Sequence, residues 1–214
     1  MRALVIGATG AVGSEVVRQL LANDSWTRVR VLARRPATET HPKLQWYAGD
    51  LLSDDFISSH LGEITHIFMC IGSTRKKTPD RQVYRAIDYG IPVRTATLAS
   101  RTNVYHMLVV SAIGSNAKSM IFYSRMKGEM ERDVAATDVP RVDFFRPSTI
   151  IGSRPENRPL EDFAIKIDRW FGRLIPDAYR AVTAQQIAKV MIAKARETEE
   201  GRFIVGNEEI YRFR

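Results

Sequence analysis

A tyrosine and a lysine four residues apart are the residues of this sequence best suited to proton transfer. Tyr123 and Lys127 lie in the stretch FYSRMK, and on a helix this spacing puts both side chains on one face, about 5–6 Å apart. A lysine ammonium stabilises a nearby phenolate and lowers its pKa from about 10. Tyrosine then becomes a usable acid or base at neutral pH. Ordinary solvated helix faces carry the same spacing, so its meaning depends on the elements that position the pair.

A serine stands twelve residues before Tyr123, at the end of an apolar run. This residue, Ser111, lies in VVSAIGSN. Hydride transfer to a carbonyl leaves an alkoxide that needs a proton, which Tyr123 can supply. A serine hydroxyl can hold the same substrate oxygen by a hydrogen bond. The residue types therefore predict Ser111, Tyr123 and Lys127 as the catalytic residues.

Apolar runs typical of strands alternate with segments of helical period along the chain. The expected strands are Ala3–Ile6, Val29–Ala33, Leu44–Tyr47, Ile64–Ile71, Tyr105–Ser111, Val142–Phe145 and Phe203–Val205. The expected helices begin at Ala11 and continue at Tyr84–Leu98, Met120–Val134, Leu160–Phe171 and Ala184–Ala195. This alternation predicts an α/β fold with a doubly wound parallel sheet of the Rossmann type. We expect residues 1–214 to form one domain, to which about 152–214 add a small C-terminal substrate cap.

A glycine-rich turn joins the first expected strand to the first expected helix. It reads IGATGAVG and places Gly7, Gly10 and Gly13 at the spacing of a dinucleotide-binding turn. The first glycine allows a tight turn, the second lets the backbone approach a diphosphate, and the third lets helix pack on strand. Free N–H groups at the helix N-terminus then attract the diphosphate. Ligands of such sheets sit outside the carboxyl ends of the strands, which is where Ser111 is expected.

The end of the second expected strand, LARRP, bears on the choice of cofactor. NAD-specific folds place an acidic residue near this point to bond the ribose 2′-OH. Arg34 and Arg35 stand there instead, and guanidinium groups bind a 2′-phosphate through charge-assisted hydrogen bonds. The sequence predicts NADP(H) in preference to NAD(H), against the alternative that both arginines are surface charges.

These motifs together resemble the short-chain dehydrogenase/reductase superfamily in its atypical or extended branch. The stretches that carry the resemblance are IGATGAVG, LARRP, GDL, CIGST, VVSAIGSN, YSRMK and FFRPSTIIG, and they span nearly the whole chain. Within the superfamily, CIGSTRKK, FYSRMKGEME and WFGRLIPDAYRAV look most like the small oxidoreductases related to the Tat-interacting protein. The resemblance to NmrA-type proteins is looser.

The resemblance implies a set of cofactor-binding positions. They are Gly7, Thr9, Gly10, Ala11, Val12 and Gly13 for the pyrophosphate, Arg34 and Arg35 for the adenosine phosphate, Asp50 and Leu51 for the adenine, Cys70, Ile71, Gly72 and Ser73 for the ribose, and Tyr123, Lys127, Arg146, Pro147, Ser148 and Thr149 for the nicotinamide end. One position departs from the family pattern. Many relatives place an asparagine on the helix after the fourth strand, where this chain has Asp88, which weakens a four-residue proton relay.

Composition narrows the partners and the location. The net charge of +8 favours anionic partners, but the basic residues are scattered and no nucleic-acid recognition motif is visible. No apolar run approaches the roughly 18–20 residues of a membrane span. The single cysteine, Cys70, permits no internal disulfide and favours a cytoplasmic location. We expect a small-molecule substrate, no nucleic acid and no membrane, and a homodimer is compatible with the sequence.

Other candidate residues favour structural interpretations. Cys70 ends an apolar run, so a buried and inert thiol is favoured over a nucleophile. The four histidines show no ligand spacing, and no metal is expected. Arg75–Lys77 suits either a loop over the cofactor or a solvated loop.

Two functions remain open from the sequence. The first is an NADPH-dependent oxidoreductase of small carbonyl substrates. The second is a cofactor-sensing regulator with little or no turnover, as NmrA-type proteins exemplify. The Tyr123–Lys127 pair favours the enzyme.

Overall fold

The computed structural model describes residues 1–37, 40–74, 78–151 and 176–213. Within them a seven-stranded sheet has the order β3-β2-β1-β4-β5-β6-β9, and every neighbouring pair is parallel. The strands are β1 (Arg2–Ile6), β2 (Arg28–Ala33), β3 (Leu44–Ala48), β4 (His66–Met69), β5 (His106–Val110), β6 (Arg141–Arg146) and β9 (Gly201–Gly206). A separate pair joins β7 (Ile150–Ile151) to β8 (Val182–Thr183). This confirms the expected doubly wound, Rossmann-like sheet.

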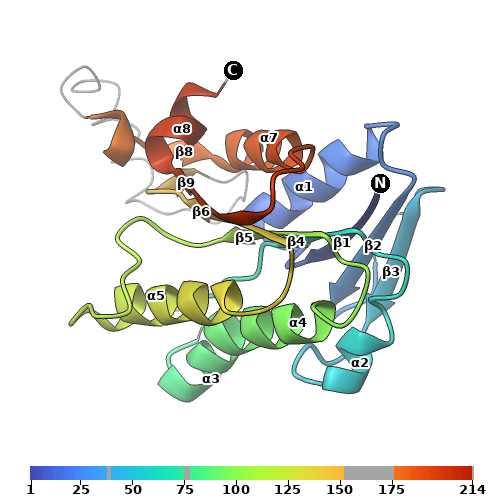
Figure 1. The fold of residues 1–214 in the computed structure, drawn as a ribbon, viewed down its shortest axis with the longest axis horizontal. Coiled ribbons are helices and arrows are strands. Elements are labelled where there is room, and N and C mark those ends of the chain that lie inside the picture. Colours follow the sequence, from blue (N-terminus) through green and yellow to red (C-terminus); the bar gives the residue numbers. More distant parts are fainter. Residues whose placement is uncertain (38–39, 75–77, 152–175, 214) are drawn as a thin grey trace.

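Helices cover both faces of this sheet (Figure 1). On one face lie α1 (Ala11–Leu21) and α7 (Ala184–Lys194), and on the other α3 (Arg81–Arg85), α4 (Ile91–Ala99) and α5 (Phe122–Ala135). The short elements are α2 (Asp54–Ser58), the 3₁₀ turn η2 (Asp177–Tyr179) and α8 (Asn207–Arg212). Each layer of helices encloses its own apolar cluster against the sheet. The central strands are apolar on both sides because both faces are covered.

The helix expected over Tyr84–Leu98 is divided by a π-helical turn. This turn, η1, spans Ala86–Gly90 and connects α3 to α4. Pro92 lacks the N–H that would bond the Asp88 carbonyl in a regular α-helix, so the ladder is interrupted at this point. Turns of this type often mark functional sites.

Much of the C-terminal segment belongs to the main layers. Strand β9 pairs with β6, and α7 packs against α1. The cap expected over about 152–214 is therefore not confirmed for 176–213. The helix expected at Leu160–Phe171 and the loop Arg75–Lys77 lie outside the described residues. Among the described helices, none has the length and apolarity needed to cross a bilayer.

Candidate active site

The loops after β1 and β4 meet at the point where the strand order reverses. Gly7 follows β1 with φ of +90°, and a Cβ on it would lie 2.5 Å from the carbonyl carbon of Cys70, which follows β4. Only glycine tolerates both the positive φ and this contact. In open α/β sheets the crevice at such a reversal is where ligands bind. Burial raises the pKa of the Cys70 thiol, which keeps it protonated and argues against a nucleophile.

The start of α1 fits a diphosphate. Gly10 is the N-cap of the helix and offers no side-chain acceptor, and the first turn contains no acidic residue. A Cβ on Gly13 would lie 2.2 Å from the Gly7 carbonyl oxygen, so helix and strand approach too closely for any side chain. The N–H groups at this N-terminus and the helix dipole remain available to an anion. Thr9 is exposed beside this turn and Ala11 is partly buried, whereas the Val12 side chain lies in the core.

The residues predicted for the adenosine end lie after β2 and β3. Arg34 and Arg35 are both exposed, and the Arg35 carbonyl accepts a hydrogen bond of 2.8 Å from the Trp46 indole nitrogen. Asp50 is exposed, and its carboxylate accepts the Leu52 N–H at 2.9 Å. The Leu51 side chain is buried in the core. The guanidinium groups are therefore open to an anionic ligand at this edge.

Lys127 forms a buried ion pair with Asp88. Its Nζ lies 3.3 Å from Oδ1 of Asp88, and the two side chains are 4% and 1% exposed. The other carboxylate oxygen accepts the Ser73 N–H at 2.8 Å. Burial raises the pKa of Asp88, while the Lys127 ammonium and the Ser73 N–H oppose that rise. The departure from the family pattern thus falls on a residue in direct contact with the predicted catalytic lysine.

Tyr123 lies at the start of α5 and is 39% exposed. Its ring stacks on the Tyr84 ring, with centroids 6.5 Å apart and planes 16° from parallel. Tyr84 comes from α3 and directs its hydroxyl to the Ser73 carbonyl at 3.5 Å. Burial raises the pKa of Tyr84, and the charges of Asp88 and Tyr123 add to that rise. Of the two phenols, Tyr123 is the more accessible to a substrate.

Ser111 is buried at the carboxyl end of β5 and contacts Ser115. The two hydroxyl oxygens are 3.0 Å apart, and the Ser115 hydroxyl donates to the Ala112 carbonyl at 2.7 Å. Because that bond uses the single proton of Ser115, Ser111 donates to Ser115 and keeps lone pairs for other partners. Ser115 was not singled out from the sequence.

The turn Arg146–Thr149 is held in place by other elements. The Arg146 guanidinium binds Glu131 of α5 through two bonds of 3.0 and 2.5 Å. Asn207 of α8 accepts the Ser148 N–H at 2.7 Å, and the Thr149 carbonyl accepts the Val182 N–H at 3.0 Å. Pro147 is buried, and its carbonyl accepts the Ile113 N–H at 2.9 Å. The Arg146 side chain is therefore committed to α5, and a cofactor role for the turn stays a prediction that rests on its backbone and on Thr149.

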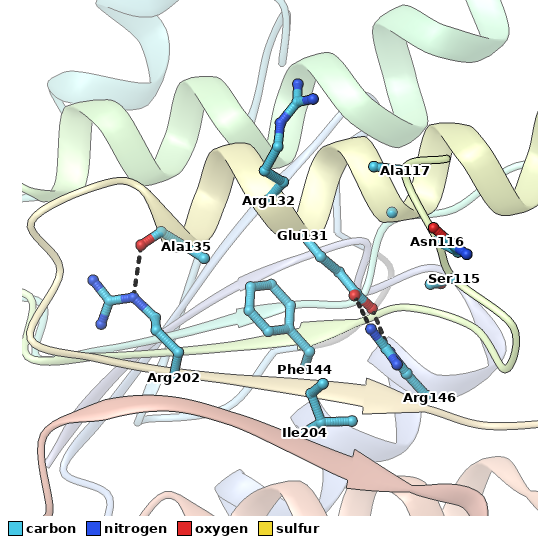
Figure 2. A pocket seen from close by; sticks show the side chains of 11 residues that line it. Ser115, Asn116, Ala117, Glu131, Arg132, Ala135, Phe144, Arg146, Arg202 and Ile204 are labelled. Atoms are coloured by element: carbon cyan, nitrogen blue, oxygen red, sulfur yellow. Dashed lines mark hydrogen bonds and ion pairs between the residues drawn. The ribbon is translucent and has the colours of Figure 1, made fainter. Parts of the chain in front are cut away.

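A cavity of about 470 Å³ lies between α5 and the strands β6 and β9. Figure 2 shows Glu131 and Arg146 paired on one side of it, Arg202 bonded to the Ala135 carbonyl on the other, and Phe144 between them. The described residues that line the cavity include neither the glycine turn nor Tyr123 or Lys127. It borders the predicted site through Ser115, which contacts Ser111, and through Arg146.

Several residues of the site were not found from the sequence. They are Tyr84, Ser115, Glu131 and Asn207, and the contact of Asp88 with Lys127. Glu131 stands four residues after Lys127. Helical spacing was therefore a signal that could have placed it on the same face as the predicted pair. Tyr84 and Asn207 reach the site from distant elements, and no local pattern marks them.

Comparisons with known proteins identify relatives along nearly the whole chain. A family model described as NAD(P)H-binding matches residues 7–142. The mitochondrial protein fmp52-1 of Aspergillus terreus is 32% identical over 217 residues, covering 97% of this chain and 92% of the relative. The mitochondrial protein FMP52 of Debaryomyces hansenii is 28% identical over 207 residues, covering 92% and 88%. The narrower resemblance to the Tat-interacting and NmrA-type proteins is not shown by these relatives.

The names of these relatives contradict the cytoplasmic location expected from the sequence, because each describes a mitochondrial protein. That expectation rested on the single cysteine, which does not distinguish one reducing compartment from another.

Solved structures share the fold at low identity. MoeE5 in complex with UDP-glucose and NAD aligns with a TM-score of 0.71 at 20% identity, covering 98% of this chain and 79% of that one. The Bordetella bronchiseptica enzyme WbmF in complex with NAD⁺ and UDP aligns with a TM-score of 0.72 at 14% identity, covering 96% and 71%. At these identities the likeness shows the fold alone.

Proposed function

Because the chain belongs to the NAD(P)H-binding family, we propose that it is an oxidoreductase of the short-chain dehydrogenase/reductase type. In this proposal it transfers a hydride between a nicotinamide cofactor and a small carbonyl or alcohol substrate. The observation that carries the proposal is the accessible Tyr123 phenol, one helical turn from the buried Lys127 ammonium. The start of α1 fits the cofactor diphosphate, as its uncapped N–H groups indicate.

Each predicted catalytic residue has a distinct role in this proposal. The bound nicotinamide supplies or accepts the hydride. Tyr123 gives its hydroxyl proton to the oxygen of a carbonyl under reduction, or takes it from an alcohol under oxidation. Lys127 stabilises the phenolate that remains. Ser111 orients the same substrate oxygen: it accepts from an alcohol with its free lone pairs, and it turns its proton from Ser115 to donate to a carbonyl.

We further propose that NADP(H) is preferred over NAD(H). Arg34 and Arg35 are exposed after β2, where a ribose 2′-phosphate would lie. Titration calorimetry with NADPH and NADH on the wild type and on Arg34→Ala/Arg35→Ala measures the preference. We expect the double substitution to weaken NADPH much more than NADH, and tighter NADH binding by the wild type would contradict the preference.

The experiment that tests the function is a panel of small aldehydes and ketones supplied with NADPH. The wild type should consume NADPH with at least one of them, and Tyr123→Phe should lose that turnover by about 100-fold or more. Tyr123→Phe should still bind NADPH, because the phenol is not needed for the diphosphate or the adenosine end. Tyr105→Phe is the matched control, since Tyr105 directly precedes β5 at the amino end of the strand, opposite the proposed site.

Two results would contradict the proposal. Equal turnover by wild type and Tyr123→Phe would remove Tyr123 from the mechanism. Tight NADPH binding without turnover of any substrate would favour the cofactor-sensing regulator.

A further inference from the structure

The ion pair between Lys127 and Asp88 joins two elements that the proposed reaction needs in fixed positions. Lys127 comes from α5, and Asp88 comes from the π-helical turn η1. Both side chains are almost fully excluded from solvent. A lysine without its partner at this depth would carry an uncompensated charge, which is strongly unfavourable. The pair therefore restricts where the Lys127 ammonium can lie.

The same carboxylate holds the loop that follows β4. Its Oδ2 accepts the Ser73 N–H at 2.8 Å, and the Ser73 hydroxyl lies 2.6 Å from that of Thr78. A Cβ on Gly72 would meet Oδ1 of Asp88 at 3.6 Å, so the loop backbone passes directly over the carboxylate. Asp88 thus contacts both Lys127 and this loop through its side chain.

We propose that Asp88 is a positioning residue for the Tyr123–Lys127 pair, which fixes the Lys127 ammonium against the loop 70–74 and offsets its charge at Tyr123. This inference rests on the proposed function, since it assigns Tyr123 the role of acid and base. It also accounts for the residue type. An asparagine would keep the bond to Ser73 but would leave the lysine charge unopposed, whereas the aspartate satisfies both.

Among the described residues of α3 and α5, the other charged groups near Tyr123 are paired or exposed to solvent. Tyr84 of α3 stacks on its ring. Arg85 of α3 is paired with Glu129 of α5 at 2.5 Å, and Arg81 lies over the Phe122 ring at 5.4 Å. Arg81 is exposed to solvent and is screened. Among the described residues, Lys127 and Asp88 are therefore a buried pair of charges one helical turn from Tyr123, little screened by solvent.

The charges of Lys127 and Asp88 should move the titration midpoint of Tyr123 in opposite directions. A double-mutant cycle separates the two effects. In Asp88→Asn the phenol should titrate at a lower pH than in the wild type, by about one unit, because the ammonium is no longer offset. In Lys127→Met it should titrate higher by a similar amount. In the double variant Asp88→Asn/Lys127→Met, both charges are gone, so the midpoint should return close to that of the wild type.

The measurement is carbon-13 NMR of the full chain labelled at the tyrosine ring and titrated without cofactor. The Tyr123 signal is identified by its loss in Tyr123→Phe. Asp138→Asn is the control, because it removes one exposed carboxylate beyond the end of α5 and should leave the midpoint unchanged. The readout does not require turnover, so an inactive protein would count against the proposed function and not against the role of Asp88.

Two outcomes would overturn the inference. The first is a Tyr123 midpoint that is the same in Asp88→Asn and the wild type. The second outcome compares Lys127→Met with the double variant. It can be measured even if Asp88→Asn alone does not fold, because the double variant has no unpaired buried charge. Equal midpoints in Lys127→Met and the double variant would show that Asp88 does not act on Tyr123.

Discussion

Gly7 is a residue whose backbone conformation could be predicted from the sequence on physical grounds. Its place between an apolar run and a helical period predicts a tight turn, and the structure gives it a φ of +90°. The same reasoning identified Gly13 as a close contact. Asp88 could be located but its role could not be predicted, because its partner Lys127 is 39 residues away and only the fold brings them together. Local geometry can be predicted from local sequence, whereas contacts between distant elements depend on packing.

Gly7→Ala should destabilise the protein by at least about 2 kcal/mol. The new Cβ would have to occupy a positive φ and lie 2.5 Å from the backbone of Cys70. Urea unfolding measures the change in the free energy of unfolding. Gly62→Ala is the control, because a Cβ there meets nothing within 4 Å. Similar stability of the two variants would contradict this account of the turn.

The elements around the site depend on one another more than their sequences indicate. The expected strands and most helices match the structure, because apolar periodicity is a local property. Gly90 and Pro92 indicated a disturbance in the helix after β4. Its division into α3, η1 and α4 depends on the hydrogen bonding of the backbone, which these residues alone do not determine. The attachment of α5 to β6 through Glu131 and Arg146 was not predicted, since it joins residues 15 positions apart in different elements.

Glu131→Gln should lower the free energy of unfolding by about 1–3 kcal/mol. Glu131 is 8% exposed and makes two bonds to Arg146, so its loss weakens a charged, mostly buried contact between α5 and β6. Thermal unfolding of the variant measures the effect. Glu15→Gln removes the more exposed pair with Arg18 and should cost less than about 1 kcal/mol. A larger loss for Glu15→Gln would contradict the ranking.

At the scale of the whole molecule, polar groups are divided between the two ends of the sheet. The predicted site lies at the carboxyl ends of the strands. At the amino ends, the first residues of β4, β5 and β6 are buried and in register: His66, His106 and Arg141. Arg141 binds Asp143 at 3.0 Å and Glu197 at 2.6 Å. The alternation of elements predicted the doubly wound architecture, but this buried row depends on strand register, which the sequence does not specify.

The stability of the fold should fall with acidification because of His66. Burial, and then the neighbouring His106, lowers the pKa of His66 from 6.5 to about 4. Between these values the unfolded chain binds a proton that the folded chain excludes, so stability is lost as the pH falls from about 6.5 towards 4. The slope due to this group is at most about 1.4 kcal/mol per pH unit.

Urea unfolding at several pH values measures this slope for the wild type and for His66→Gln. The glutamine is polar but does not titrate, so the variant should show a shallower decline over the same window. His41→Gln is the control, because His41 is exposed and its loss should leave the slope unchanged. An equal slope in wild type and His66→Gln would exclude His66 as the source.

The central claim is that a hydride passes from the nicotinamide to a carbonyl carbon while Tyr123 gives its proton to the carbonyl oxygen. The most direct measurement supplies NADPH deuterated at the transferable position together with a reactive aldehyde or ketone from the panel, and follows deuterium in the product by mass spectrometry. The account predicts one deuterium on the former carbonyl carbon with the wild type, and at least about 100-fold slower labelling with Tyr123→Phe. Labelling at the same rate in both proteins, or none in either despite bound NADPH, would contradict it.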